Sequence, residues 1–153
     1  MSEFSKYPRF EEFKGKNILS VDYGEKAIGL ASFCPGRDPF PLTRGKIKNA
    51  GFHNFLKSLK EVIDEDFFEI LVFGIPYLTD GSESEKTLEM KKYFQIIRES
   101  CSDLLVFEQD ETLSTFEAKK RMENSAEFNF KVDIKRIDEV SAIIILEDFI
   151  RSN

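Results

Sequence analysis

Four acidic residues stand where a folded chain could use them for chemistry. Asp22 closes one apolar run of the sequence, Asp110 and Glu111 follow another, and Asp138 opens a third. In open α/β sheets, ligands bind beyond the carboxyl ends of the strands, so acids that follow apolar runs lie where a site is expected. An isolated charge there is costly unless a hydrogen bond, a cation or a metal ion compensates it.

Each of these acids also has a structural interpretation. Asp22 could accept hydrogen bonds from the turn that follows it, and Asp110 could cap the turn that leads into the next helix. Glu111 could be a solvated loop residue. Asp138 could be stabilised by the dipole of its helix, an effect worth about 0.3–1 kcal/mol. Taken singly, none of the four distinguishes a functional site from a structural role.

The apolar run that ends at Asp22 predicts a strand over about residues 17–22. Side chains alternate along a strand, so Ser20 and Asp22 share one face. The turn formed by residues 23–26 follows, and its Gly24 can take a positive φ. Asp22 is therefore expected to project from the end of a strand whose neighbours are packed.

The rest of the chain predicts two more strands, and then strands that alternate with helices. Both later strands are continuous apolar runs, which are typical of a sheet covered on both faces. Capping boxes are predicted at Ser82 with Glu85 and at Ser114 with Glu117. The expected elements are strands over about residues 27–33 and 42–48 (the second edge-like, with a bulge at Gly45), a helix within 49–65, a strand within 68–76, a helix within 82–101, a strand within 103–109, and helices within 114–124 and 136–150.

The size and composition of the chain favour one domain with a substantial core. It has 153 residues, of which 41% are hydrophobic, including sixteen Phe and no Trp. Residues 1–14 are interpreted as an N-terminal extension, with Phe4, Phe10 and Phe13 as its ordering side chains, and residues 15–153 as the domain. The two cysteines have no metal-like spacing and are expected to be reduced thiols. No apolar run approaches membrane-spanning length, so the protein is expected to be soluble and cytoplasmic, with no membrane partner.

The formal net charge of −6 argues against a surface that binds nucleic acid everywhere. It does not exclude a local basic strip. It also fits a site in which carboxylates gather around divalent cations, because the metal ions reverse the local sign of charge.

Four segments together resemble the motif blocks of one protein family. They are ILSVDYGEKAIGLA, LVFGIPYLTDGSESEKT, DETLSTFEA and IDEVSAIIILEDF, and they span about residues 18–150 in family order. This set resembles the YqgF/RuvX family, whose members are described as pre-16S ribosomal RNA nucleases and as Holliday junction resolvases. The resemblance implies an α/β, ribonuclease H-like fold: a mixed five-stranded sheet with helices on both faces. The order of elements above agrees with it.

The resemblance carries three catalytic acids to this sequence. The family's first-strand Asp matches Asp22, the Glu of its D-E-R-L-S-T motif matches Glu111, and its final-helix Asp matches Asp138. Three carboxylates make an oxygen-ligand cluster suited to Mg²⁺ or Mn²⁺. Two such ions about 3.5–4 Å apart clamp the attacking water and the leaving oxygen of a phosphodiester displacement.

The sequence departs from the family pattern at basic and polar positions. Residues 25–29 read EKAIG where the family usually has T-K-R-I-G, which removes an arginine. Thr112 replaces the arginine of D-E-R-L-S-T, and Leu78 replaces an asparagine. These changes alter the expected phosphate contacts and leave the three acids untouched.

Basic residues are concentrated in the C-terminal part of the chain, together with two hydroxyl side chains at a helix start. These features suggest contacts to a nucleic-acid substrate, although a solvated helix face would also explain the charges, and a capping role would explain Ser114. The residues expected to bind substrate are Lys26, Ser114, Thr115, Lys120 and Arg136.

Three functions remain open at this point. The first is a metal-dependent nuclease on structured nucleic acid, either pre-16S rRNA ends during ribosome biogenesis, free or in a pre-ribosomal particle, or branched DNA at a Holliday junction. The second is an actin-like ATPase, which D-x-G resembles, although 153 residues supply only one of the two domains such proteins need. The third is a non-catalytic nucleic-acid or ribosome-binding module. The sequence carries no signal for an oligomeric state.

Overall fold

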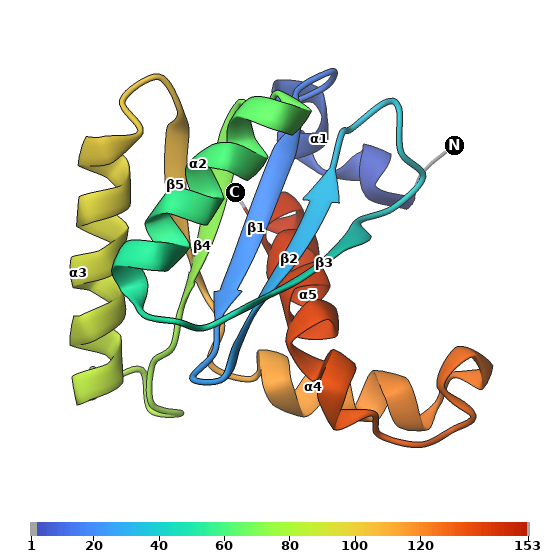
Figure 1. The fold of residues 1–153 in the computed structure, drawn as a ribbon. Helices are drawn as coiled ribbons and strands as arrows, with labels where there is room; N and C mark the ends of the chain where they lie inside the picture. Colours follow the sequence, from blue (N-terminus) through green and yellow to red (C-terminus); the bar gives the residue numbers. More distant parts are fainter. Residues whose placement is uncertain (1–2, 153) are drawn as a thin grey trace.

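A five-stranded mixed sheet forms the centre of the protein, whose computed structural model describes residues 3–152 (Figure 1). The strand order is β3-β2-β1-β4-β5, with antiparallel pairing among β3, β2 and β1 and parallel pairing from β1 through β5. The expected mixed five-stranded sheet is therefore confirmed. The strands are β1 (Ile18–Tyr23), β2 (Ala27–Phe33), β3 (Leu42–Lys48), β4 (Ile70–Ile75) and β5 (Leu105–Asp110).

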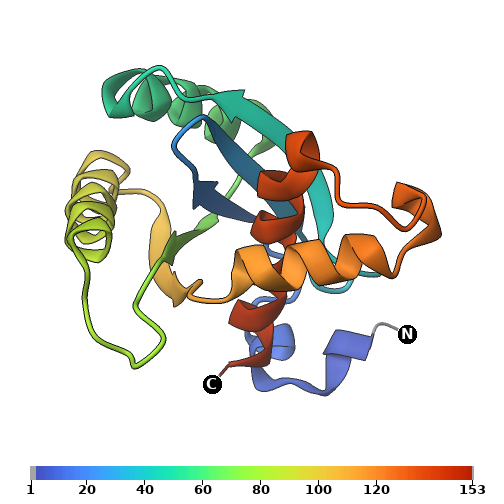
Figure 2. The same cartoon turned by 90° about the horizontal axis from the view of Figure 1, so that it is seen from below.

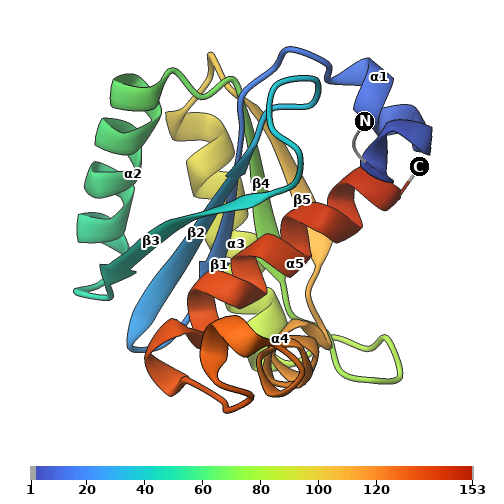
Figure 3. The same ribbon diagram turned by 90° about the vertical axis from the view of Figure 1, so that its right-hand side faces the viewer.

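Helices cover both faces of this sheet, as expected. Figure 3 shows α2 and α3 on one face and α5 running diagonally across the other, with α4 at one end of α5 and α1 at the opposite end. The long helices are α2 (Phe52–Asp66), α3 (Glu85–Ser100), α4 (Ser114–Glu123) and α5 (Ile137–Arg151); the short ones are α1 (Pro8–Glu12) and the 3₁₀ turns η1 (Glu3–Lys6), η2 (Ala126–Phe128) and η3 (Ile134–Arg136).

The alternation predicted for β1 divides the hydrophobic core into two layers. Leu19 and Val21 pack with side chains of α2 and α3 on one face, while Ile18 packs with α5 on the other. On the α5 face, Ser20 Oγ donates a hydrogen bond to the carbonyl oxygen of Ala142 at 2.7 Å. Asp22, two residues further along, therefore points to the side on which α5 lies.

The first turn of α5 lies directly on strand β2 because position 29 has no side chain. An ideal Cβ built on Gly29 would lie 2.0 Å from the carbonyl oxygen of Asp138 and 2.9 Å from the backbone nitrogen of Glu139. These contacts are with helix backbone, which cannot rotate away as a side chain can. Gly29 thus sets how closely the start of α5 approaches the sheet.

Two predictions about the edges of the sheet have different outcomes. The edge position of β3 and its bulge are confirmed, since the register shifts opposite Gly29–Ala31 and Gly45 has φ of 82°. The prediction that the strand within 103–109 is buried is wrong. It becomes β5, the other edge of the sheet, and Leu105 is 59% exposed.

The predicted capping box at Ser82 and Glu85 is wrong. Helix α3 is capped by Ser84, which forms a reciprocal box with Thr87. Ser82 is held one turn earlier, where its backbone N–H and hydroxyl both donate to Asp80. Its hydrogen bonds to Asp80 therefore hold Ser82 in a loop turn, and Ser84 caps the helix instead.

The predicted capping box at Ser114 and Glu117 is also wrong. Helix α4 follows Leu113 and has no side-chain cap. The hydroxyl of Ser114 is buried and turns back toward Glu111, with 3.4 Å between Ser114 Oγ and Glu111 Oε2. The Ser114 hydroxyl therefore donates to Glu111, which precedes the helix, and does not cap the helix backbone.

The N-terminal residues that the structure describes pack against the α5 side of the sheet. Phe4, Phe10 and Phe13 are all buried, and the ring of Phe13 stacks on Phe149 of α5 with a centroid separation of 5.6 Å. The division at residue 14 into extension and domain stays a prediction, and residues 1, 2 and 153 lie outside the described part.

Two smaller expectations can be compared with the structure. Cys34 and Cys101 are both free thiols, as expected. Within residues 3–152, no helix is long and apolar enough to cross a membrane.

Replacing Gly29 by alanine should destabilise the fold by about 2–3 kcal/mol, because the new Cβ overlaps the backbone of α5. Gly81→Ala is the control. Nothing lies within 4 Å of its Cβ position, so only its φ of 87° is unfavourable, at a cost of about 1–2 kcal/mol. Urea unfolding of both variants measures the difference. A Gly29→Ala protein as stable as the wild type would contradict the close approach.

Candidate active site

Three carboxylates from distant parts of the chain meet at one edge of the sheet. Asp22 lies near the end of β1, Glu111 directly follows β5, and Asp138 lies in the first turn of α5. Figure 2 views the molecule from this edge, where the ends of β1 and β5 and the starts of α4 and α5 come together. The edge is formed by the carboxyl ends of the parallel strands, where sites of α/β sheets are found.

Glycines on both neighbouring strands make room for the other two acids beside Asp22. On one side Asp22 pairs with Gly29, on which the backbone of Asp138 rests. On the other side Gly74 follows Phe73, the partner of Val21, so it lies next to Asp22. A Cβ at Gly74 would lie 3.0 Å from the carboxyl carbon of Glu111.

Gly24 has a different role from the one predicted. The sequence suggested a positive φ in the turn after β1, but Gly24 is not among the residues with positive φ. Its Cβ would instead lie 2.4 Å from the carbonyl oxygen of Ala27 and 2.9 Å from Asp138 Oδ1. Gly24 is needed for space, and that space holds the Asp138 carboxylate.

Asp22 and Glu111 are in direct contact and share a hydrogen bond between their carboxyl groups. Asp22 is only 7% exposed. Burial, assisted by the nearby charge of Asp138 and opposed by the Glu111 hydrogen bond, raises the pKa of Asp22 to about 6. Burial and the Asp22 charge raise the pKa of Glu111 well above its usual value. Ionising both members of the pair is therefore unfavourable unless additional positive charge compensates them.

Asp138 is half-buried, and two lysines lie near the three acids. Burial raises the pKa of Asp138, while the positive charge of Lys46 on β3 acts in the opposite direction. On the other side, the charge of Lys86 in the first turn of α3 lowers the pKa values of both Asp22 and Glu111. None of the three acids has an ion pair with an arginine within residues 3–152.

The donor set fits a hard divalent cation in its chemistry. It consists of carboxylate oxygens only, which Mg²⁺ and Mn²⁺ prefer. One turn along α5 from Asp138, Ser141 Oγ is buried without a hydrogen-bond partner among the described residues. Within residues 3–152, no group of three or more His, Cys, Asp or Glu side chains is arranged so that it could hold a metal ion.

The residues expected to contact substrate lie in different environments. Lys26, Thr115 and Lys120 are exposed, and Lys26 lies in the β1–β2 turn, in which Gly24 approaches the Asp138 carboxylate. Ser114 is buried against Glu111 and therefore orients this acid. Arg136 packs over the ring of Phe128 at 4.6 Å. The substrate contacts of these five residues stay a prediction.

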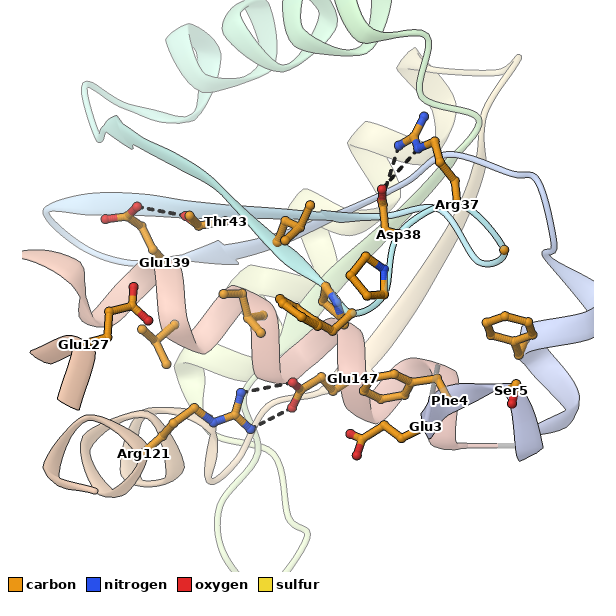
Figure 4. A pocket seen from close by; sticks show the side chains of 18 of the residues that line it. Glu3, Phe4, Ser5, Arg37, Asp38, Thr43, Arg121, Glu127, Glu139 and Glu147 are labelled. Carbon is orange, nitrogen blue, oxygen red and sulfur yellow. Dashed lines mark hydrogen bonds and ion pairs between the residues drawn. The ribbon is translucent and has the colours of Figure 1, made fainter. Parts of the chain in front are cut away.

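Arg136 also lines a groove of about 1090 Å³ along α5. Figure 4 shows this groove, with Arg121 paired to Glu147 and Arg37 paired to Asp38. Arg136 lies 3.6 Å from Glu127 and 4.0 Å from Glu139. Arg121 forms two hydrogen bonds with Glu147, at 3.0 and 2.7 Å. The two arginines of the basic concentration predicted for the C-terminal part are thus paired with acids within the fold.

The sequence did not single out Lys46, Lys86, Gly29 or Gly74. The two glycines could have been found only from the strand register, which a local apolar pattern does not specify. Lys86 follows the cap residue Ser84, so its place near the site depends on where α3 begins. The only sign in the sequence that Lys86 lies near the acids was its position in the predicted first turn of that helix.

Comparison with known families identifies the chain. The family model described as "RuvX: Holliday junction resolvase" matches residues 16–152. The chain belongs to the RuvX family. This match includes all three acids and both lysines that lie near them.

Curated relatives of this RuvX-family chain agree with the assignment. A protein of Lactobacillus johnsonii named "Putative pre-16S rRNA nuclease" is 28% identical over 137 residues, covering 88% of this chain and 95% of the relative. A protein of Rippkaea orientalis with the same name is 30% identical over 136 residues, covering 89% and 96%.

Solved structures share the fold at low sequence identity. RuvC of Thermus thermophilus in complex with a Holliday junction substrate superimposes with a TM-score of 0.56 at 10% identity, covering 88% of this chain and 93% of RuvC. The yeast mitochondrial Holliday junction resolvase Ydc2 has a TM-score of 0.55 at 8% identity, covering 94% and 82%. The expected ribonuclease H-like fold is confirmed.

The metal-free protein should lose stability as pH rises from about 4 to about 6. The folded state holds a proton on Asp22 that the unfolded state releases near the usual Asp pKa, so up to about 3 kcal/mol is lost across this window. Asp22→Asn should remove this part of the pH dependence and be more stable than the wild type at about pH 7.5. Thermal unfolding in EDTA at several pH values measures it.

Asp148→Asn is the matched control for this experiment. Burial also raises the pKa of Asp148 to about 6, but this residue lies near the far end of α5. Replacing Asp148 should remove only the part of the pH dependence of stability that Asp148 contributes and leave the part due to Asp22. An Asp22→Asn protein with the wild-type pH profile would contradict the raised pKa of Asp22.

Proposed function

We propose that this chain is a divalent-metal-dependent nuclease that hydrolyses phosphodiester bonds in structured RNA, with the ends of pre-16S ribosomal RNA as its substrate. The observation that carries the proposal is the meeting of Asp22, Glu111 and Asp138 around two glycines at the carboxyl edge of the sheet. The names of the curated relatives support ribosomal RNA as the substrate.

The crowding of the acids supports a cation as the missing partner. Two contacting carboxyls do not stabilise each other as an ion pair does, because both are negative when ionised. Their raised pKa values reflect this unfavourable arrangement. A purely structural role would favour an arginine or amide at one of the positions. The arrangement instead leaves negative charge that a divalent ion would compensate.

Each residue of the site has a distinct task in this proposal. Asp22, Glu111 and Asp138 would hold Mg²⁺ or Mn²⁺, and Ser114 orients the Glu111 carboxylate. When bound, such ions polarise the phosphodiester and lower the pKa of the attacking water.

A second candidate is cleavage of branched DNA, which the Holliday junction bound to RuvC and the description of the family model favour. The same acids would serve either substrate, because the chemistry at the phosphodiester is shared. The two substrates are distinguished by the experiment below, in which RNA containing the pre-16S ends and a four-way DNA junction are offered in parallel.

Labelled RNA containing the pre-16S ends should be cut in Mn²⁺ or Mg²⁺ and left intact in EDTA. Asp22→Asn, Glu111→Gln and Asp138→Asn should each lower the rate by about 100-fold or more, because metal ions contribute several kcal/mol to such reactions. Asp148→Asn changes a carboxylate on the same helix as Asp138 and should cut normally.

The outcome separates the functions considered for this chain. Faster cutting of the DNA junction than of the RNA would assign a resolvase instead. Binding of RNA without cleavage in either metal would contradict the nuclease proposal and leave a binding module.

A further inference from the structure

Strand β3 carries lysines along the edge of the sheet next to the three acids. Lys46 and Lys48 are both exposed, and Lys48 pairs with Ala27, which follows Lys26 in the β1–β2 turn. Because β3 runs parallel to β1, its last residues lie at the same edge as Asp22. Three lysines therefore border one side of the candidate active site.

The strand register puts Lys46 in the same cross-strand row as Asp22. Asp22 pairs with Gly29, and Gly29 pairs with Lys46. Residues directly opposite each other on neighbouring strands share a face, so Lys46 and Asp22 lie on the same side of the sheet. Strands are about 4.8 Å apart, so the two Cα atoms are about 10 Å from each other. Asp138 rests on Gly29 between them.

The local contacts leave these lysines largely without acidic partners. The ammonium group of Lys46 donates to the carbonyl oxygen of Lys135, just before α5. Among ion pairs formed within residues 3–152, none includes Lys26, Lys46 or Lys48. The arginines of the neighbouring groove differ in this respect, since Arg121 and Arg136 are paired with glutamates.

We propose that Lys46 and Lys48, together with Lys26, form a phosphate-binding edge that holds the substrate strand to one side of the bond that is cleaved. This inference rests on the proposed nuclease function and adds the direction in which the nucleic acid crosses the site. The cross-strand row from Asp22 through Gly29 to Lys46 gives the direction of this edge, from the three acids outward across the sheet. Backbone charge carries no sequence information, so this edge positions the strand without selecting its bases.

The charge of the whole chain makes such a local edge necessary for binding. With a net charge of −6, the chain as a whole opposes the approach of a polyanion. Glu25 precedes Lys26 in the β1–β2 turn, and Glu139 on α5 accepts a hydrogen bond from Thr43 near the start of β3. A nucleic-acid strand that reaches the three acids is therefore attracted most favourably along the lysines of β3.

Salt-dependent binding of a fluorescently labelled RNA stem-loop with single-stranded flanks tests the proposal. Measured in EDTA between about 50 and 200 mM KCl, log K should fall with log salt less steeply for Lys46→Gln and Lys48→Gln than for the wild type, by about 0.7 per lost contact. Lys46→Arg keeps the charge and should retain the wild-type slope.

Lys60→Gln is the control for net charge, because Lys60 is exposed on α2 beside a pocket at the amino ends of β4 and β5. Lys48→Gln guards against a structural effect of losing the Lys46 hydrogen bond. The proposal is overturned if both Lys46→Gln and Lys48→Gln retain the wild-type slope, or if Lys60→Gln lowers it equally.

The binding measurements and the cleavage measurements test the two proposals independently. If the lysine variants lower the slope but the wild type cuts neither RNA nor DNA in Mn²⁺, the binding edge stands and the nuclease function fails. If the wild type cuts RNA and the lysine variants bind with the wild-type slope, the nuclease stands and the binding edge fails.

Discussion

Helix α5 approaches strand β2 at Gly29 so closely that no side chain fits between them. This contact fixes the depth at which the first turn of α5 lies and brings Asp138 beside Asp22, the cross-strand partner of Gly29. Gly74 gives the matching space on the opposite side of Asp22, into which Glu111 fits. Absent side chains on two strands are thus what allow three acids from separate elements to share one edge.

Crowding these acids has an energetic cost that the protein alone does not compensate. Asp22 and Glu111 are held in contact, and burial raises the pKa values of both. The nearby cations, Lys86 and Lys46, lie toward the rim of the site on α3 and β3. Such an arrangement is less stable than a neutral packing of the same positions would be. Functional sites commonly retain unfavourable charge that a ligand compensates.

The order of elements followed from the sequence because it depends on local periodicity. The alternation along β1, which puts Ser20 and Asp22 on one face, and the position of Asp138 near the start of α5 followed for the same reason. The pairing of Asp22 with Gly29 did not follow, because a slip of one residue changes every cross-strand neighbour and no local pattern fixes it. The edge position of β5 depends on strand order, which burial patterns within one strand do not encode.

Capping was mispredicted where a nearby acid competed for the serine. Ser82 is bound to Asp80, and Ser114 turns to Glu111, so neither hydroxyl serves a helix backbone. The family resemblance identified the three acids but did not supply the reason they fit together. That reason lies in glycines whose side-chain space is used by residues far away in the chain.

Anomalous diffraction from crystals soaked in Mn²⁺ tests whether Asp22, Glu111 and Asp138 hold divalent cations together, as proposed. We expect an anomalous peak between β1 and the start of α5, with oxygen ligands from all three carboxylates. A Mn²⁺ peak elsewhere in the protein, or one at this edge that excludes Asp138, would contradict it.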